Sequence, residues 1–466
     1  MKERGFPLSL VAIASLATFL SNLSAGIANV PLADVGSALG GGFGAGGYAL
    51  VAIVLAYLVP YAVVMPVVGK LGDRYGHKRV FLGGLGLYVL GSLAAAASPG
   101  AAALIASRTV QGLGGGVILD SIVFISAGVR QGRGVAFGVW RAALLSGTVG
   151  GPVIGGYLSA LLGWRSLTWL PALPAVLLWL WGAVSLNELP RSDEVFDWVG
   201  SVLFLVGLSA VVVALSASGM DTMQAGLAAA TGRVMHAMAW MLYGVFGVAM
   251  ALLWIHQKTD KRALFDLSLY RIRPFVLGNL GTWLVCVGMF SAMMFVPLQM
   301  QYVEGYTGLA ATNALLPLAL AALVVGVWGG RIADRLGPLP PWVTGFALMA
   351  ASFVVLALLG PHPSRATLFA VLTACGVGMA LPLAPTALTA LGQVPEAAAG
   401  QAGGLFNFAH NMGRAMGLGL LGALLVRREP GSYAAIYGIS AALMAVGAAL
   451  PLALRTRKAT SCAHNL

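Results

Sequence analysis

The sequence predicts an all-α membrane protein made of two six-helix bundles with two further helices inserted between them. Hydrophobic residues make up 59% of its 466 residues and charged residues only 9%, whereas about 25% of the residues of a soluble domain are charged. The octapeptide GKLGDRYG at Gly69–Gly76 returns as GRIADRLG at Gly330–Gly337. Two charged linkers of one design, each between apolar runs, indicate an internal duplication.

Taking about 20 apolar residues as one span, the sequence predicts fourteen helices. They cover residues 8–30, 46–68, 79–98, 101–125, 135–160, 165–186, 198–218, 235–256, 274–298, 308–330, 340–360, 366–390, 400–426 and 432–455. The two linkers must lie on one side of the membrane, so an even number of helices separates the starts of the halves. The predicted division is therefore a bundle at 1–190, an inserted pair at 191–262 and a second bundle at 263–466. The apolar run at the start is long enough to span and is expected to be a retained first helix.

Lysine and arginine in the loops predict the orientation. With the amino terminus inside, nineteen of these bases lie in inner loops and five in outer loops. A multi-pass protein of the cell membrane with both termini cytoplasmic is expected. This placement also accounts for the net charge of +12 without a nucleic acid partner. The three cysteines are too scattered for a metal cluster, and no cofactor is expected.

Several motifs resemble those of a known family. The stretch Gly69–Arg79 resembles the signature loop between helices two and three of the major facilitator superfamily. The helix-four motif of that family is similar to the stretch holding Arg108, Gln111 and Gly112. Its helix-five antiporter motif is similar to the run with Gly147, Gly151, Pro152, Gly155 and Gly156. The fourteen-helix layout, Asp197–Gly200, Pro297 and Gln301 are similar to the fourteen-helix drug/proton antiporter branch.

The resemblance implies a transporter, not an enzyme, in which two halves rock about a central site and amphiphilic compounds or drugs leave in exchange for protons. It assigns the two linkers to conformational control. Glycines would allow a tight turn, and charged side chains would latch the ends of the halves through charge-assisted bonds. The expected gating residues are Gly69, Asp73, Arg74, Gly76, Lys78, Gly330, Asp334 and Arg335. The simpler alternative is that the bases only fix the topology.

Ionisable residues inside the membrane are functional candidates because they are costly there. Asp120 and Arg141 lie at similar depth on consecutive helices and are expected to pair, whereas Arg108 points about 120° away from Asp120. Asn407, His410, Asn411 and Arg414 form a polar stripe that either lines the transport path or joins neighbouring helices. Asp120 and His410 are the candidate proton-coupling residues.

The sequence departs from the antiporter pattern in helix one, where Ser24 stands in the place of an acid and only Asn29 of that motif is kept. The expected cavity residues include Asn29, Gln301 and three bases, Arg108, Arg141 and Arg414. These bases would give the cavity a positive charge. An anion or lipid transporter, coupled otherwise or facilitative, is therefore the alternative to a drug exporter. A non-transporting membrane sensor is a third possibility. The expected partners are the bilayer, an amphiphilic substrate and protons, with the protein acting as a monomer.

Overall fold

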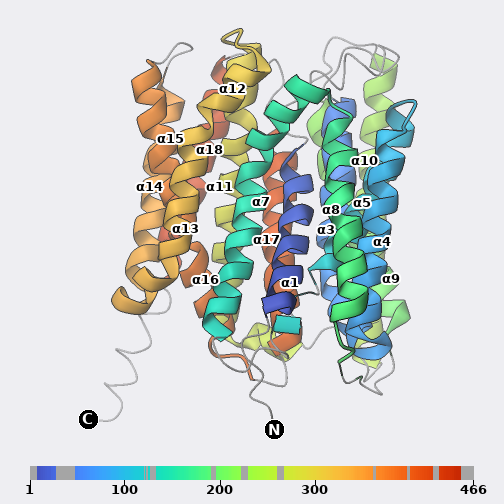
Figure 1. Ribbon diagram of the computed structural model, residues 1–466. Helices are drawn as coiled ribbons and strands as arrows, with labels where there is room; N and C mark the ends of the chain where they lie inside the picture. Colours follow the sequence, from blue (N-terminus) through green and yellow to red (C-terminus); the bar gives the residue numbers. More distant parts are fainter. Residues whose placement is uncertain are drawn as a thin grey trace. The chain divides into compact units, whose positions relative to one another are not determined.

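The computed structural model describes residues 8–27, 48–119, 121, 124–125, 133–189, 191, 196–221, 229–259, 267–359, 364–395, 399–422, 424 and 430–452. Every regular element within these ranges is a helix (Figure 1). The all-α class expected from the composition is confirmed for this part of the chain.

The chain folds into two compact units, the first formed by Met1–Phe265 with Thr307–Asn313 and the second by Asp266–Tyr306 with Ala314–Leu466. The first unit holds α1 (Leu8–Ile27), α3 (Tyr48–Tyr75), α4 (His77–Ala96), α5 (Ala101–Ile118), α7 (Arg133–Leu162), α8 (Ser166–Ser185), α9 (Trp198–Asp221), α10 (Ala229–Thr259) and most of α12 (Gly308–Ala314). The second holds the short 3-10 helix η2 (Leu267–Arg271), α11 (Arg273–Tyr302), α13 (Leu316–Leu336), α14 (Leu339–Leu358), α15 (Arg365–Ala380), α16 (Leu383–Leu391), α17 (Ala399–Gly422) and α18 (Pro430–Ala449).

The same helix pairings occur in both units. In the first, α1 packs on α7 and α8, α4 packs on α5 and α8, and α3 packs on α5. In the second, α11 packs on α17 and α18, α14 packs on α15 and α18, and α13 packs on α15. The helices α9 and α10 have no counterpart in this scheme; they pack on each other, and α9 also packs on α3. This is the pattern that a duplication with an inserted helix pair predicts, while the boundaries at residues 190 and 262 stay predictions.

Small residues set the closest helix crossings of both units. A Cβ atom added at Gly147 of α7 would overlap the carbonyl oxygen of Phe19 on α1, and one added at Gly413 of α17 would overlap the carbonyl oxygen of Trp283 on α11. Membrane helices gain little from hydrophobic burial against each other, so close backbone approach at small residues is a main source of their association. The α1–α7 and α11–α17 crossings are equivalent in the two units, and in both a glycine allows the backbones to approach closely.

The predicted helix ends at residues 68 and 330 come too early, because both octapeptides are helical almost to their last residue. Helix α3 continues to Tyr75 and α13 continues to Leu336. The turn comes only at the last residue of each octapeptide, where Gly76 has φ +102° and Gly337 has φ +79°. L side chains rarely adopt such angles, so these two glycines end the helices.

Two predicted helices are interrupted. The span predicted at 308–330 is divided into α12 and α13, and the span predicted at 366–390 is divided into α15 and α16. Pro382, just before α16, has no N–H group to donate to the preceding turn, which explains the second break. Eleven helices of the described residues are long and apolar enough to cross a membrane. The predicted spans at 101–125, 198–218 and 400–426 do not meet that measure there, so the count of fourteen stays a prediction.

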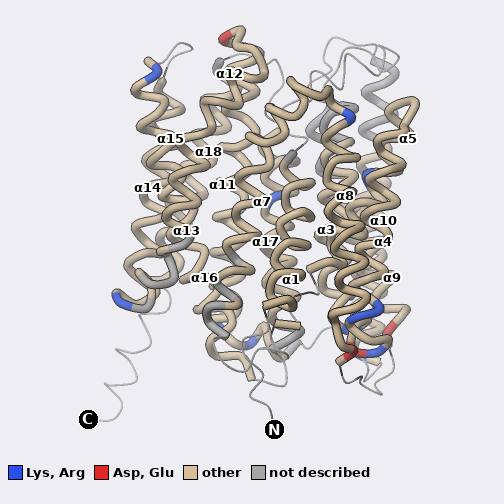
Figure 2. Tube along the Cα trace, in the orientation of Figure 1, with Lys and Arg blue, Asp and Glu red and all other residues tan. Residues whose placement is uncertain are grey.

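Charged residues of the described chain gather at the helix ends, and the middles of the helices are almost entirely uncharged (Figure 2). Within the first unit, bases and acids cluster together near the ends of α4 and α9. Arg108 and Arg414 are exceptions, since each is buried within a helix. These two buried bases are therefore candidate functional residues.

Candidate functional site

The linker between α3 and α4 is fastened to the chain that follows α8. The carboxylate of Glu188 accepts a hydrogen bond from the backbone N–H of Lys78 at 2.9 Å, at the start of α4, where a negative charge is favoured. The ammonium group of Lys78 donates to the carbonyl oxygen of Ala183 at 2.8 Å. Glu188 also lies 3.8 Å from the guanidinium of Arg191. The start of α4 is thus held by two residues, Ala183 near the end of α8 and Glu188 after it, and Arg191 lies against Glu188.

The charged residues predicted to form the latch differ in their environments. Asp73 is exposed, and its Oδ1 lies 3.0 Å from Nε2 of the buried His77. Arg74 and Arg335 are exposed, whereas the side chains of Arg331 and Asp334 lie outside the described residues. The gating role of the linkers stays a prediction, and Glu188 and His77 are partners that the sequence did not single out.

Arg108 is the centre of a buried polar network in the first unit. Its side chain is 1% exposed, donates from Nη1 to Oε1 of Gln111 at 2.8 Å, and donates from Nη2 to the carbonyl oxygen of Ser24 at 3.1 Å. The guanidinium also lies over the ring of Tyr57, 4.7 Å from its centroid. Within the described part of the chain, Arg108 has no acidic partner, and its Nε has no hydrogen bond.

Further hydrogen bonds extend this network across four helices. Gln111 donates from Nε2 to Oγ of Ser92 at 2.7 Å, and the hydroxyl groups of Ser24 and Tyr88 are 2.5 Å apart. The hydroxyl of Tyr57 donates to the carbonyl oxygen of Ser21 at 2.7 Å. Ser24, which stands where the antiporter pattern has an acid, therefore contributes both its hydroxyl and its carbonyl group to the surroundings of Arg108.

The helix-five motif lies within α7, and its glycines meet other helices of the same unit. Gly151 approaches Gly26 of α1 so closely that a Cβ atom added at Gly151 would lie only 3.0 Å from the Gly26 Cα. Pro152 and Gly155 are buried. A Cβ added at Gly156 would overlap the side chain of Thr312 on α12. The motif is a packing surface, as its small residues predict.

In the second unit, the polar stripe of α17 faces α11 at two points. Nδ1 of His410 lies 3.1 Å from Sγ of Cys286, and the guanidinium of Arg414 lies 4.8 Å from the ring centroid of Phe290. Arg414 also donates to Oδ1 of Asn411 at 2.9 Å. His410, Asn411 and Arg414 are buried. These contacts favour the interpretation in which the stripe joins neighbouring helices.

The remaining predicted site residues are spread over different surroundings. Asn407 is half-buried and accepts a hydrogen bond at its carbonyl oxygen from the side chain of Asn411 at 2.9 Å. Gln301 is half-buried and donates to the carbonyl oxygen of Pro297 at 3.2 Å. Asn29 and Asp120 lie outside the described residues, as does the side chain of Arg141. The predicted Asp120–Arg141 pair therefore stays a prediction.

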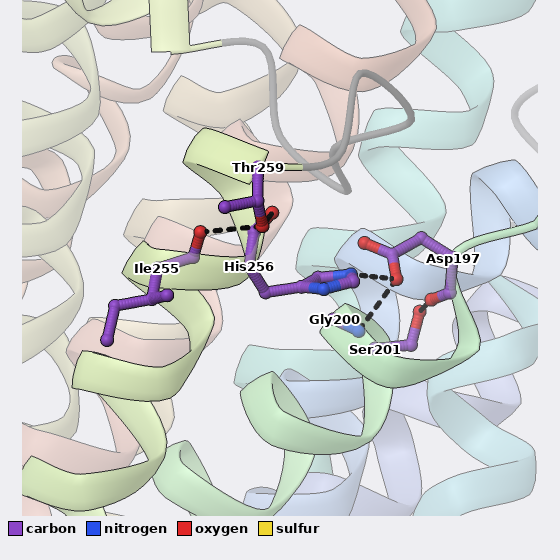
Figure 3. Close-up of polar contacts among 6 residues, drawn as sticks. All are labelled: Asp197, Gly200, Ser201, Ile255, His256 and Thr259. Carbon is purple, nitrogen blue, oxygen red and sulfur yellow. Dashed lines mark hydrogen bonds and ion pairs between the residues drawn. The ribbon is translucent and has the colours of Figure 1, made fainter.

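Sequence reasoning missed a buried acid–histidine pair at the ends of the inserted helices. Oδ1 of Asp197, before α9, lies 2.9 Å from Nε2 of His256, near the end of α10 (Figure 3). The sequence marked Asp197 only as part of a family motif and gave His256 no role, because 59 residues separate them. Within the described residues, no three acidic, histidine or cysteine side chains converge as a metal site would require.

Long apolar helices, duplicated packing and buried bases define a polytopic helical membrane protein built from two related bundles. A sequence model of the Major Facilitator Superfamily matches residues 14–418. The chain therefore belongs to the Major Facilitator Superfamily. By that membership it is a membrane transporter and not an enzyme.

Curated relatives of known name cover most of the chain. The chain is 30% identical to the multidrug resistance protein Stp of Mycobacterium tuberculosis over 425 residues, which are 90% of this chain and 75% of that protein. It is 27% identical to the multidrug efflux pump LfrA of Mycolicibacterium smegmatis over 380 residues, 80% of this chain and 72% of that protein. It is 25% identical to the multidrug transporter protein MdtP of Bacillus subtilis, over 81% of this chain and 68% of that protein.

Solved structures share the fold. A peptide transporter POT in complex with sulfate matches with a TM-score of 0.68 at 17% sequence identity, covering 98% of this chain and 96% of that one. A D-xylose-proton symporter matches with a TM-score of 0.65 at 14% identity, covering 95% of this chain and 97% of that one. At such identities the likeness concerns the fold alone.

Proposed function

We propose that this protein exports amphiphilic small molecules or drugs across the cell membrane by alternating access, in exchange for protons. The observation that carries the proposal is the 30% identity to the multidrug resistance protein Stp over 90% of the chain. The duplicated helix pairings support alternating access, because related bundles can exchange between two arrangements about one site. Both termini are assigned to the cytoplasm from the loop charges.

Asp120 and His410 are the proposed proton-coupling residues. A carboxyl group in a low-dielectric site and a histidine are the side chains whose proton affinity can be set near neutral pH. His410 is buried against α11 with Cys286 at 3.1 Å, so a proton on its ring would be sheltered from solvent. Asn29, Arg141, Gln301 and Asn407 are the proposed polar contacts of the transport path.

A second candidate is the transport of an anionic amphiphile or a lipid. Arg108 favours it, since this buried cation has no acidic partner within the described residues and its Nε is without a hydrogen bond. A buried positive charge of this kind attracts an anionic group more than a cationic one. The charge of the transported compound separates the two candidates.

The test is counterflow of protons in proteoliposomes that carry a trapped pH dye. Adding cationic, zwitterionic and anionic amphiphiles in turn should release protons for the transported class. Asp120→Asn should abolish the release, His410→Gln should reduce it, and Glu304→Gln, at the loop after α11, serves as the matched control and should leave it unchanged. Substrate movement without proton movement would contradict antiport, and movement of anions alone would replace the drug-export proposal with the second candidate.

A further inference from the structure

The Asp197–His256 pair joins the start of α9 to the end of α10, and nothing in the proposed transport cycle uses it (Figure 3). Asp197 precedes the first residue of α9, and its Oδ1 accepts a hydrogen bond from the backbone N–H of Gly200 at 2.7 Å. The same oxygen lies 2.9 Å from Nε2 of His256. The side chains of Asp197 and His256 are 3% and 20% exposed. The pair is therefore largely removed from water.

The two helix ends favour opposite charges at this place. The start of a helix stabilises an anion and the end of a helix stabilises a cation. Asp197 is the N-cap of α9, and His256 lies in the last turn of α10. Each side chain therefore stands at the helix end that suits the sign of the charge it can carry.

The carboxylate depends on His256 for compensation. Its Oδ2 is buried and has no hydrogen-bond partner within the described residues. The backbone N–H of Gly200 is a neutral donor, so among the described contacts of Asp197 only His256 can offer a positive charge. With a neutral imidazole only the acceptor of this hydrogen bond carries a charge; protonation of His256 adds the opposite charge on the donor and makes the bond an ion pair.

The pair is also connected to the linker that follows α3. Trp198, next to Asp197, packs between two other aromatic rings. The centroid of its ring lies 4.7 Å from that of Phe196 and 6.3 Å from that of Tyr75. Tyr75 is the last residue of α3, directly before the turn at Gly76. The cluster of Phe196, Trp198 and Tyr75 therefore connects the start of α9 to the end of α3.

Other titratable and charged groups lie on the neighbouring helices α10 and α3, and the half-buried Lys70 of α3 is among them. On α10, the ammonium of Lys258 lies over the ring of Trp254, 4.8 Å from its centroid. On α3, Asp73 is bound to His77 at 3.0 Å and Arg74 is exposed. His256 lies directly against the Asp197 carboxylate, so its protonation changes the charge beside that group.

We propose that Asp197 and His256 form a proton-binding clasp that fastens α9 to α10, and through Trp198 to the end of α3, when His256 is protonated. With this clasp, the packing of α9 on α10 depends on the pH of the solution around His256, near the linker between α3 and α4. It is separate from the proton-coupling residues, and it does not require that transport itself moves protons.

Hydrogen–deuterium exchange of the full chain in lipid nanodiscs, at pD 5.5 and 8.0 without substrate or gradient, tests the clasp. After correction for the chemical exchange rate, peptides covering residues 198–204 and 250–258 should be about fivefold better protected at pD 5.5. That factor corresponds to about 1 kcal/mol at 1.4 kcal/mol per factor of ten, the size expected when the hydrogen bond gains its second charge and becomes an ion pair.

His256→Gln keeps an N–H donor but cannot take up a proton. In this variant, the protection of the two peptides from exchange should therefore be the same at pD 5.5 and 8.0. Gly200→Ala places a methyl group against Oδ2 of Asp197 and should shrink the difference while both titrating groups remain. Gly247→Ala is the matched control on α10, where an added Cβ meets nothing within 4 Å, and should keep the full difference. Equal protection of the wild type at both values, or an unchanged difference in His256→Gln, would overturn the proposal. Because no transport is measured, either result leaves the antiport test independent.

Discussion

Replacing Gly76 by alanine tests the account of the first linker most directly, because two separate costs fall on that residue. Gly76 has φ +102°, and an alanine there would carry strain of about 1–3 kcal/mol. Its methyl group would also lie 2.6–2.8 Å from the three carboxylate atoms of Glu188. Moving Glu188 away breaks its hydrogen bond to Lys78, which at this exposed position contributes about 1 kcal/mol.

The expected loss of unfolding free energy for Gly76→Ala is therefore about 2–4 kcal/mol. Two other glycines of the octapeptides separate the contributions. Gly337→Ala meets the same kind of strain, at φ +79°, but nothing within 4 Å, so it should be milder by about 1 kcal/mol. Gly69→Ala falls inside α3 with nothing within 4 Å, and it should be neutral or stabilising by up to about 1 kcal/mol.

The assay is unfolding in mixed detergent micelles, followed by helix content, for the three variants and for Glu188→Ala in the Gly76→Ala background. In the double variant the clash with Glu188 is gone, while the strain at position 76 and the loss of the Glu188–Lys78 hydrogen bond remain; because that bond is lost only once, the two changes should not add. If Gly69→Ala proves as damaging as Gly76→Ala, or if Gly76→Ala costs nothing, then the turn is not where the structure places it and the argument fails.

Three further predictions concern the buried contacts of Arg108, Gly147 and Cys286. Arg108→Lys keeps the charge but cannot hold both acceptors and the stacked ring, so it should lower the unfolding free energy by about 2–3 kcal/mol, measured in the same micelles; an unchanged value would remove Arg108 from the centre of the network. Gly147→Ala should weaken the α1–α7 crossing by more than about 2 kcal/mol, whereas Gly150→Ala, whose nearest atom is a side-chain carbon at 3.6 Å, should be nearly neutral; equal melting temperatures of the two would contradict the crossing. Cys286→Ser keeps a donor beside His410 and should retain the pH profile of the proposed proton-coupled transport, while Cys286→Val should shift that profile; identical profiles would show that the thiol does not act on the imidazole.

The sequence was sufficient for the features that depend on composition and order along the chain. Apolar runs of membrane length predicted the helices, because lipid leaves the backbone no partner other than itself. The repeated octapeptides predicted the duplication, and the helix pairings of the two units agree with it. The motifs around Arg108 and Gly147 indicated the family before any fold was seen.

Helix ends and side-chain partners required the tertiary structure. GKLGDRYG contains three glycines, and the sequence could not tell that only Gly76 takes a positive φ while Gly69 stays helical. The surroundings of Arg108 come from α1, α3 and α5, and periodicity along one helix gives its depth but not which neighbour it faces.

The Asp197–His256 pair shows the same limit most clearly. Its two members are 59 residues apart, at opposite ends of two helices that pack side by side. Each looks like an ordinary loop-side polar residue in the sequence. Only the antiparallel return of α10 along α9 brings the carboxylate at a helix start against the imidazole at a helix end, where both helix dipoles act on one hydrogen bond.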